Sequence, residues 1–287
     1  MRVLDLTILF VDTVPARIYL ALLKKHGYLP NKILFVEQEL SSKKYKLLKS
    51  LLGDFLSKKL YSAYNSHRLK KDNYNDLNKQ FLDKNSISFK EINDFFVDYP
   101  VNQVTKLKVS NINDKKLVNH IKSKVKGPVL FTGGGILKKE ILSLNNVKFI
   151  HIHPGIVPDV RGADCFFWSY LFNNKPGYSI FYMNEGIDTG DILYKKEFDI
   201  DFQYLALTSY KNNDIYHSIL KYYDPCLRIK SFINLLDKQF ENSEVAEKFV
   251  DLMNMPFEKQ NPNEGRMYFF MHKNLRNFVI NKLKSKA

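Results

Sequence analysis

Three side chains of this sequence could act together on one substrate: His151, His153 and Asp188. The two histidines lie two residues apart, just before Pro154, and the aspartate follows in a later glycine-flanked segment. An imidazole changes its charge nearest to neutral pH, and a nearby carboxylate favours the protonated ring and fixes its orientation. Such a trio can move protons while an amine attacks a carbonyl group and a tetrahedral oxyanion forms.

The stretch before the histidines predicts the element that positions them. Residues 147–153 are largely apolar or β-branched and stop at Pro154-Gly155, which indicates a strand that ends in a turn. Side chains two apart on a strand share a face, so His151 and His153 are expected to project together near its carboxyl end. Open α/β sheets bind their ligands at that end of their strands.

The rest of the chain alternates strand and helix patterns. We expect β-α-β over residues 1–38, helices over 41–97 and 113–125, and strands over 101–109, 128–131, 147–153, 178–183 and 192–195. This alternation predicts an α/β fold with a doubly wound, mostly parallel sheet, a mainly helical insert and a short C-terminal extension. We expect residues 1–200 to form a catalytic domain, with the basic helical insert at about 41–97. Residues 201–287 are expected to form the mainly helical extension.

The residues around the trio resemble the signature of a known enzyme family. In the family's order, the chain contains His151-Ile152-His153-Pro154, Val157-Pro158, Arg161-Gly162 and Ile187-Asp188-Thr189-Gly190. This order is similar to that of the enzymes that transfer a formyl group from 10-formyltetrahydrofolate to an amine. The resemblance is strong over residues 128–195 and weaker over residues 2–38. It implies a Rossmann-like formyltransferase fold with 10-formyltetrahydrofolate as the cofactor.

The resemblance also implies roles for single residues. His153 matches the family's catalytic histidine and Asp188 matches its carboxylate partner. His151 stands where the family has an asparagine that donates a hydrogen bond to the formyl oxygen. An imidazole N–H can donate to an oxyanion too, so the exchange either preserves that role or marks a different chemistry. The implied cofactor-binding positions are Gly135, Ile136 and Leu137 beside the pteridine, and the closing loop of Asn184, Glu185, Gly186 and Ile187.

Other functions remain open for the same residues. Two histidines and an aspartate are also a set of nitrogen and oxygen ligands for a metal ion. Because one histidine and the aspartate belong to a metal-free signature, we expect no metal. The alternatives are a formyltetrahydrofolate hydrolase, a metal-dependent enzyme that uses His151, His153 and Asp188, and a binding protein without catalysis on the same scaffold.

Charge and composition limit the partners of the chain. The 287 residues carry a net charge of +14, and the excess of Lys and Arg lies mainly in residues 41–126. We favour the interpretation that this basic segment is a solvated, lysine-rich helical face. The alternative is that it attracts an anion such as a nucleotide diphosphate or RNA. No aromatic-interleaved RNA motif accompanies it, so we do not expect a nucleic-acid partner. Two distant cysteines and a charged N-terminal segment favour a cytoplasmic protein without membrane association.

The C-terminal residues bear on the choice of amine. Residues 210–240 repeat their apolar side chains mostly at helical spacing. Methionyl-tRNA formyltransferases carry a C-terminal β-barrel, which requires several alternating strands that this sequence does not display. We therefore expect a small-molecule amine substrate, such as an amino sugar on a nucleotide, rather than initiator tRNA. A homodimer is compatible with the sequence.

Overall fold

The computed structural model describes residues 1–38, 75–93, 104–203, 205–241, 250–261 and 263–286, together with residues 50, 53 and 56. Most of the basic helical insert expected at about 41–97, including its lysine-rich runs, lies outside these residues. Its continuous described part contains the helices α3 (Asn75–Lys84) and α4 (Phe89–Asn93). The role expected for the basic segment stays a prediction.

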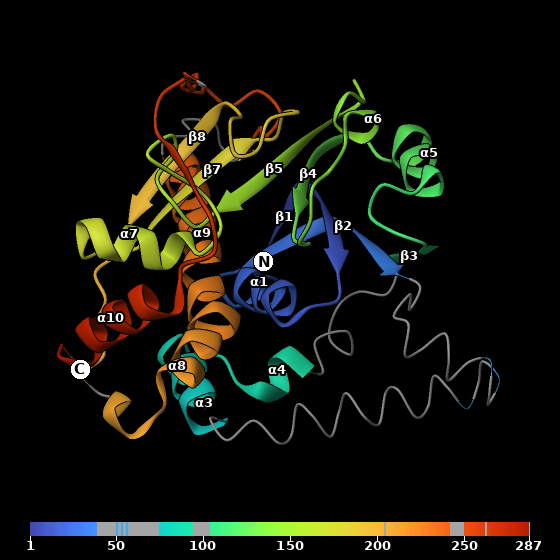
Figure 1. Ribbon diagram of the computed structural model, residues 1–287. Coiled ribbons are helices and arrows are strands. Elements are labelled where there is room, and N and C mark those ends of the chain that lie inside the picture. The colour runs from blue at the N-terminus through green and yellow to red at the C-terminus, as the bar shows by residue number, and fades with distance from the viewer. Residues whose placement is uncertain are drawn as a thin grey trace.

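A seven-stranded sheet forms the centre of the fold (Figure 1). Its strands lie in the order β3 (Val104–Val109), β2 (Tyr28–Gln38), β1 (Arg2–Val11), β4 (Gly127–Phe131), β5 (Val147–His153), β7 (Gly177–Tyr182) and β8 (Ile192–Glu197). The first five pair in parallel, while β7 runs antiparallel to β5 and β8 antiparallel to β7. The mostly parallel sheet expected from the sequence is confirmed.

The central strand β1 shows why the sheet is covered on both faces. Its successive side chains point to opposite faces, so Ile8 and Phe10 enter one apolar core while Leu9 enters another. The first core contains residues of α1 (Val14–Lys25) and α9 (Asp224–Glu241). The second contains Leu117 and Ile121 of α5 (Lys115–Lys124). Helices on both faces make the sheet doubly wound, as predicted.

Residues after position 200 return to the sheet. Helices α8 (Asn212–Ser218) and α9 are joined by a π-helical turn, Ile219–Tyr223, and α10 (Lys273–Lys284) follows near the end of the described chain. Figure 1 shows α9 running beside α1 across one face of the sheet. At its far end the hydroxyl of Tyr28 on β2 donates to Asp237 Oδ1 over 2.5 Å. The division of the chain at residue 200 stays a prediction.

A small second sheet lies beside the end of β5. It pairs β6 (Val160–Gly162) in parallel with β9 (Arg266–Tyr268), far apart in the sequence. Helix α7 (Cys165–Asn173) follows β6, and the short helix α6 (Lys139–Leu142) precedes β5. This second sheet fixes the backbone of residues 160–162, which the site described below uses. In the described part of the chain, no helix has both the length and the apolar character needed to cross a membrane.

Candidate active site

The end of strand β5 carries both histidines on one face. Phe149 shares that face and packs in the core on the α5 side of the sheet, and His151 and His153 follow at alternate positions. Their ring centroids lie 6.3 Å apart, and the Phe181 ring on the neighbouring strand β7 lies 5.7 Å from His151. The expected projection of the two histidines from one face is therefore what the structure shows.

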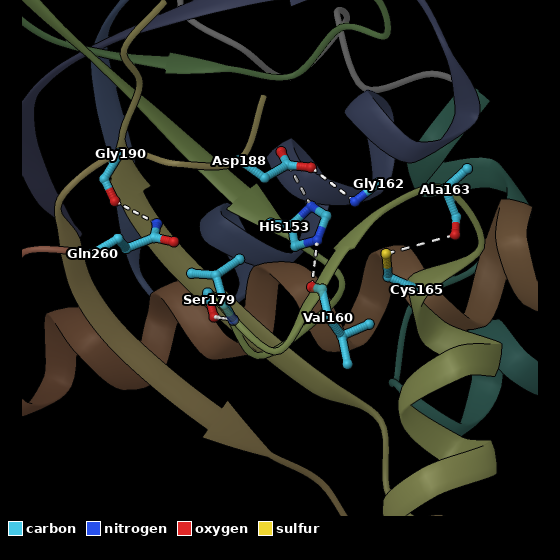
Figure 2. Close-up of polar contacts among 10 residues, drawn as sticks. His153, Val160, Gly162, Ala163, Cys165, Ser179, Asp188, Gly190 and Gln260 are labelled. Atoms are coloured by element: carbon cyan, nitrogen blue, oxygen red, sulfur yellow. Dashed lines mark hydrogen bonds and ion pairs between the residues drawn. The ribbon is translucent and has the colours of Figure 1, made fainter. Parts of the chain in front are cut away.

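His153 is held between a backbone carbonyl and a carboxylate (Figure 2). Its Nε2 lies 3.2 Å from the carbonyl oxygen of Val160, and its Nδ1 lies 3.5 Å from Oδ1 of Asp188. The His153 side chain is 3% exposed and the Asp188 side chain 13% exposed. The pair is thus nearly dry, which strengthens its electrostatic interaction.

The carbonyl of Val160 determines which nitrogen of His153 carries a proton. A carbonyl oxygen only accepts, so Nε2 is the protonated nitrogen of the neutral ring and Nδ1 holds the lone pair. This lone pair faces Oδ1 of Asp188 at 3.5 Å. A proton on either atom would attract the other, so the two groups are placed to exchange one proton.

Burial sets the charges of the trio. Loss of hydration lowers the pKa of His153 to about 3, with the positive charge of Arg228 adding to the effect. The pKa of His151 is lowered to about 3 by burial and then by neighbouring His153. The pKa of Asp188 is raised by burial. The trio thus favours neutral imidazoles beside a carboxyl group that holds its proton more tightly than usual.

Asp188 is fixed by its own backbone and by Gly162. Its φ of 55° lies in the left-handed region, which aspartate tolerates better than most residues. Gly162 donates its backbone N–H to Oδ2 of Asp188 over 3.0 Å. Gly162 itself has a φ of 100°, and a Cβ there would lie 2.2 Å from the carbonyl oxygen of Tyr268. Only glycine fits this position, so the Arg-Gly turn of the signature places a backbone donor against the Asp188 carboxylate.

A small pocket of ≈ 90 Å³ opens beside the trio. Every residue expected to bind the cofactor lies in its wall, which is formed by Phe131, Gly135, Ile136, Leu137, His151, Phe181, Met183, Asn184, Glu185, Gly186, Ile187 and Asp188. His153 is absent from this wall and lies behind Asp188 and Val160, as its burial indicates. The pocket therefore presents His151 and Asp188 directly to a ligand.

The loop between β7 and β8 is held by Asn184. Its side-chain Oδ1 accepts from the Gly186 N–H at 3.1 Å and from the Thr189 hydroxyl at 2.8 Å, and its Nδ2 donates to the Thr189 carbonyl at 3.1 Å. Glu185 forms an exposed ion pair with Lys139 of α6, at 3.2 Å. Asn184 thus shapes the loop with its side-chain amide, while Glu185 connects the loop to the opposite wall.

The comparison with known families decides which family this site belongs to. Residues 97–214 match the family described as Formyl transferase. This segment is a formyl transferase domain. It contains strands β3, β4, β5, β7 and β8 of the seven-stranded sheet, the trio and the whole pocket wall, whereas β1, α1 and β2 precede it.

Individual proteins are also similar to this chain. The methionyl-tRNA formyltransferase of Clostridioides difficile (strain 630) is 36% identical over 90 residues, or 31% of this chain. The chain covers 29% of that relative's length. Among solved structures, a sugar N-formyltransferase from Shewanella is 16% identical with a TM-score of 0.43, covering 96% of this chain and 86% of that one. An N-formyltransferase from Helicobacter canadensis is 12% identical with a TM-score of 0.44, covering 99% and 80%.

Sequence reasoning missed the backbone groups that position the trio. The Val160 carbonyl and the Gly162 N–H belong to the backbone, so the types of these two residues do not reveal their role. Only the Arg-Gly turn of the signature marks the position of the Gly162 N–H. Gly155 has a similar role, because a Cβ there would lie 2.3 Å from the Val160 carbonyl oxygen and 2.9 Å from Nε2 of His153. Gly155, two residues after the end of strand β5, therefore allows the contact between His153 and Val160.

Proposed function

We propose that this chain transfers a formyl group from 10-formyltetrahydrofolate to a primary amine of a small molecule. The proposal rests on the contact between His153 and Asp188, which lies beside a pocket of the formyl transferase domain. Formyl transferases use 10-formyltetrahydrofolate, and the residues implied to bind it line this pocket.

The donor would enter between two segments of the pocket wall. Residues 135–137 offer backbone groups on one side, and residues 184–187 form the other. At ≈ 90 Å³ the pocket is smaller than the ~300–1,000 Å³ of most ligand sites. A pteridine ring therefore requires the 184–188 loop to move outward, and the hydrogen bonds of Asn184 allow the loop to move as one unit.

The chemistry requires one proton to move between two nitrogens. The neutral amine attacks the formyl carbon, a C–N bond forms, and the formyl oxygen becomes an oxyanion. The new ammonium then loses a proton, the folate N10 gains one, and the bond between the formyl carbon and N10 breaks. The proton shared by His153 and Asp188 matches this requirement, because the pair can take one proton and return another. No net proton is consumed.

His151 would stabilise the oxyanion in place of the family's asparagine. It lies in the pocket wall, and its pKa near 3 keeps the ring neutral, so one nitrogen is protonated and can donate. A donor that is already in place when the oxyanion develops stabilises the transition state more than the ground state. Donation from a neutral imidazole is thus the role we assign to His151.

For the acceptor we propose a small anionic amine such as an amino-sugar nucleotide. The net charge of +14 favours anionic ligands. The described residues after position 200 are mostly helical and contain one three-residue strand, β9. This composition supports a small acceptor over initiator tRNA, and a homodimer is part of the same proposal.

Equilibrium binding of 5-formyltetrahydrofolate, which does not donate its formyl group, tests the donor. Metal-stripped full-length protein should bind it with micromolar affinity, and Asn184→Ala should weaken the binding. A screen of amines with 10-formyltetrahydrofolate then identifies the acceptor through the formation of an N-formyl product. Formate release that needs no amine would instead indicate a hydrolase, and the absence of folate binding would overturn the proposal.

A further inference from the structure

We propose that His151, His153 and Asp188 also form a binding site for one divalent transition-metal ion such as Zn²⁺, and that the bound ion blocks formyl transfer. One donor atom from each of the three side chains lies within 4.8 Å of the other two. Two imidazole nitrogens and one carboxylate oxygen are a ligand set that zinc accepts, with further positions left for water or substrate. The second part of the proposal rests on the proposed function, whereas the metal site itself does not.

The free donor atoms point to a ligand at this place. Because Nε2 of His153 donates to Val160, its Nδ1 lone pair is the one that faces the trio. Nδ1 of His151 is buried and has no hydrogen-bond partner within the described residues. Leaving a buried polar atom without a partner is unfavourable, so binding a group that satisfies it is favoured.

The surrounding hydrogen bonds are those of a prepared metal site. Ligating histidines usually donate their other ring N–H to a carbonyl or carboxylate, and ligating carboxylates are themselves hydrogen-bonded. His153 has this partner in the Val160 carbonyl, at 3.2 Å. Asp188 has it in the Gly162 N–H, which binds Oδ2 at 3.0 Å and leaves Oδ1 for the ion.

The distances require only small movements. Donors about 2.1 Å from a tetrahedral zinc lie roughly 3.4 Å from one another. The separation of 3.5 Å between His153 and Asp188 already meets this value. His151 must close the remaining gap, which is at most about 1.4 Å from the 4.8 Å limit. A rotation of the His151 ring and a small shift of the loop that carries Asp188 can supply that movement.

Metal binding and formyl transfer exclude each other through shared atoms. An ion bound to Nδ1 of His153 and Oδ1 of Asp188 takes the place of the proton that the proposed reaction uses. It also occupies the His151 ring that faces the formyl oxygen. The residue exchange at 151 therefore gives this chain a response to metal ions that an asparagine, with its weaker amide ligand, does not provide.

Calorimetric titration of Zn²⁺ into metal-stripped full-length protein tests the site. The wild-type chain should bind one ion, and His151→Asn and Asp188→Asn should each raise the dissociation constant by at least about 100-fold. The matched control is His217→Asn, an exposed histidine of α8, which should bind as the wild type does. Thermal unfolding of the metal-free variants confirms that they are folded. Bound Co²⁺ should give the visible absorption of a nitrogen- and oxygen-ligated ion in wild type but not in His151→Asn.

The outcomes separate the metal site from the proposed reaction. Binding of equal strength in wild type and His151→Asn, or no saturable binding of one ion, would overturn the site. Formyl transfer that is unchanged when the site is saturated with Zn²⁺ would overturn the blocking role alone. If no amine is formylated, but Zn²⁺ binding is lost in both variants, the proposed function fails and the metal site stands.

Discussion

The backbone N–H of Gly162 donates to Oδ2 of Asp188 over 3.0 Å, and this hydrogen bond leaves Oδ1 of the carboxylate turned toward His153. The donor comes from strand β6 and the acceptor from the loop after β7, so two separate elements have to meet for the pair to form. This relationship predicts how the trio responds to substitution.

Replacing His153 or Asp188 with Asn should remove the shared proton. We expect kcat to fall by about 10²–10⁴-fold, which is the usual contribution of general acid–base catalysis. Binding of 5-formyltetrahydrofolate should change only a few-fold, because neither substitution alters the shape of the pocket wall. Stopped assays of N-formyl product and equilibrium binding measure the two effects, with His217→Asn as the control. Unchanged turnover in either variant would sink the assignment.

Gly162→Ala should disturb Asp188 from a distance. The new Cβ would meet the Tyr268 carbonyl at 2.2 Å in a left-handed conformation, at a cost of about 1–3 kcal/mol in the free energy of unfolding. The donor to Asp188 would then move, so kcat should fall more than the affinity for folate. Urea unfolding and steady-state kinetics measure both changes.

Gly134→Ala is the matched control for that substitution. Nothing lies within 4 Å of a Cβ at position 134, so its unfolding free energy should stay within about 0.5 kcal/mol of wild type. Equal losses of stability in the two alanine variants would contradict the steric argument at Gly162.

Gly155→Ala tests the contact between His153 and Val160. Its Cβ would approach the Val160 carbonyl at 2.3 Å and Nε2 of His153 at 2.9 Å. The imidazole has to turn away, so we expect kcat to drop by at least 10-fold while KM for folate changes little. A variant with wild-type kcat would show that the carbonyl does not set the ring's orientation.

Acid should destabilise the protein through His153. Its pKa is about 3 when folded and near 6.5 when unfolded, so the unfolded chain binds the extra proton between these values. The stabilising contribution is therefore complete above pH 6.5 and is lost as the pH falls toward 3, by about 1.4 kcal/mol per pH unit. Asp188 acts with the opposite sign, because its raised pKa favours the folded state as the carboxyl group protonates.

Denaturant unfolding of wild type and His153→Gln between pH 4 and 6 isolates this effect. The variant lacks the titrating ring, so its unfolding free energy should fall less steeply with decreasing pH. Parallel pH profiles would contradict a buried neutral imidazole at position 153.

Asn184→Ala should loosen the pocket without touching the catalytic pair. It removes three hydrogen bonds within the loop, so we expect folate to bind about 10-fold more weakly as the loop loses its ordered shape. The control is Asn119→Ala, an exposed asparagine of α5 that is not in the pocket wall. Equal folate affinity in Asn184→Ala and wild type would show that the loop does not enclose the donor.

The sequence predicts the parts of the fold that depend on local patterns. The β-branched stretches before Pro154 and around residues 128–131 become buried parallel strands, and the alternation on β5 places the two histidines together. The reversed direction of β7 has no local signal, because a strand's pattern is the same in either direction. The second strand of the β-α-β unit expected over residues 1–38 extends over Tyr28–Gln38, since pairing with β1 continues beyond the apolar segment.

The sequence could predict the side chains of the site but not the backbone groups that position them. His151, His153 and Asp188 have types that suggest chemistry, and the structure brings their donor atoms within 4.8 Å of one another. The Val160 carbonyl and the Gly162 N–H are backbone groups that every residue except proline possesses, so only the three-dimensional path of the chain reveals them. The pairing of β6 with β9 sets that path, and it joins residues about a hundred positions apart.

The packing of α9 against α1 affects how the nascent chain folds during translation. One face of β5 and β7 is covered by a helix that is made more than seventy residues after β5 itself. Until residue 241 has left the ribosome, the apolar side chains on that face stay exposed, and exposed apolar surface of this kind favours aggregation. The nascent chain is therefore expected to need chaperone protection through most of its translation, although His151, His153 and Asp188 emerge much earlier.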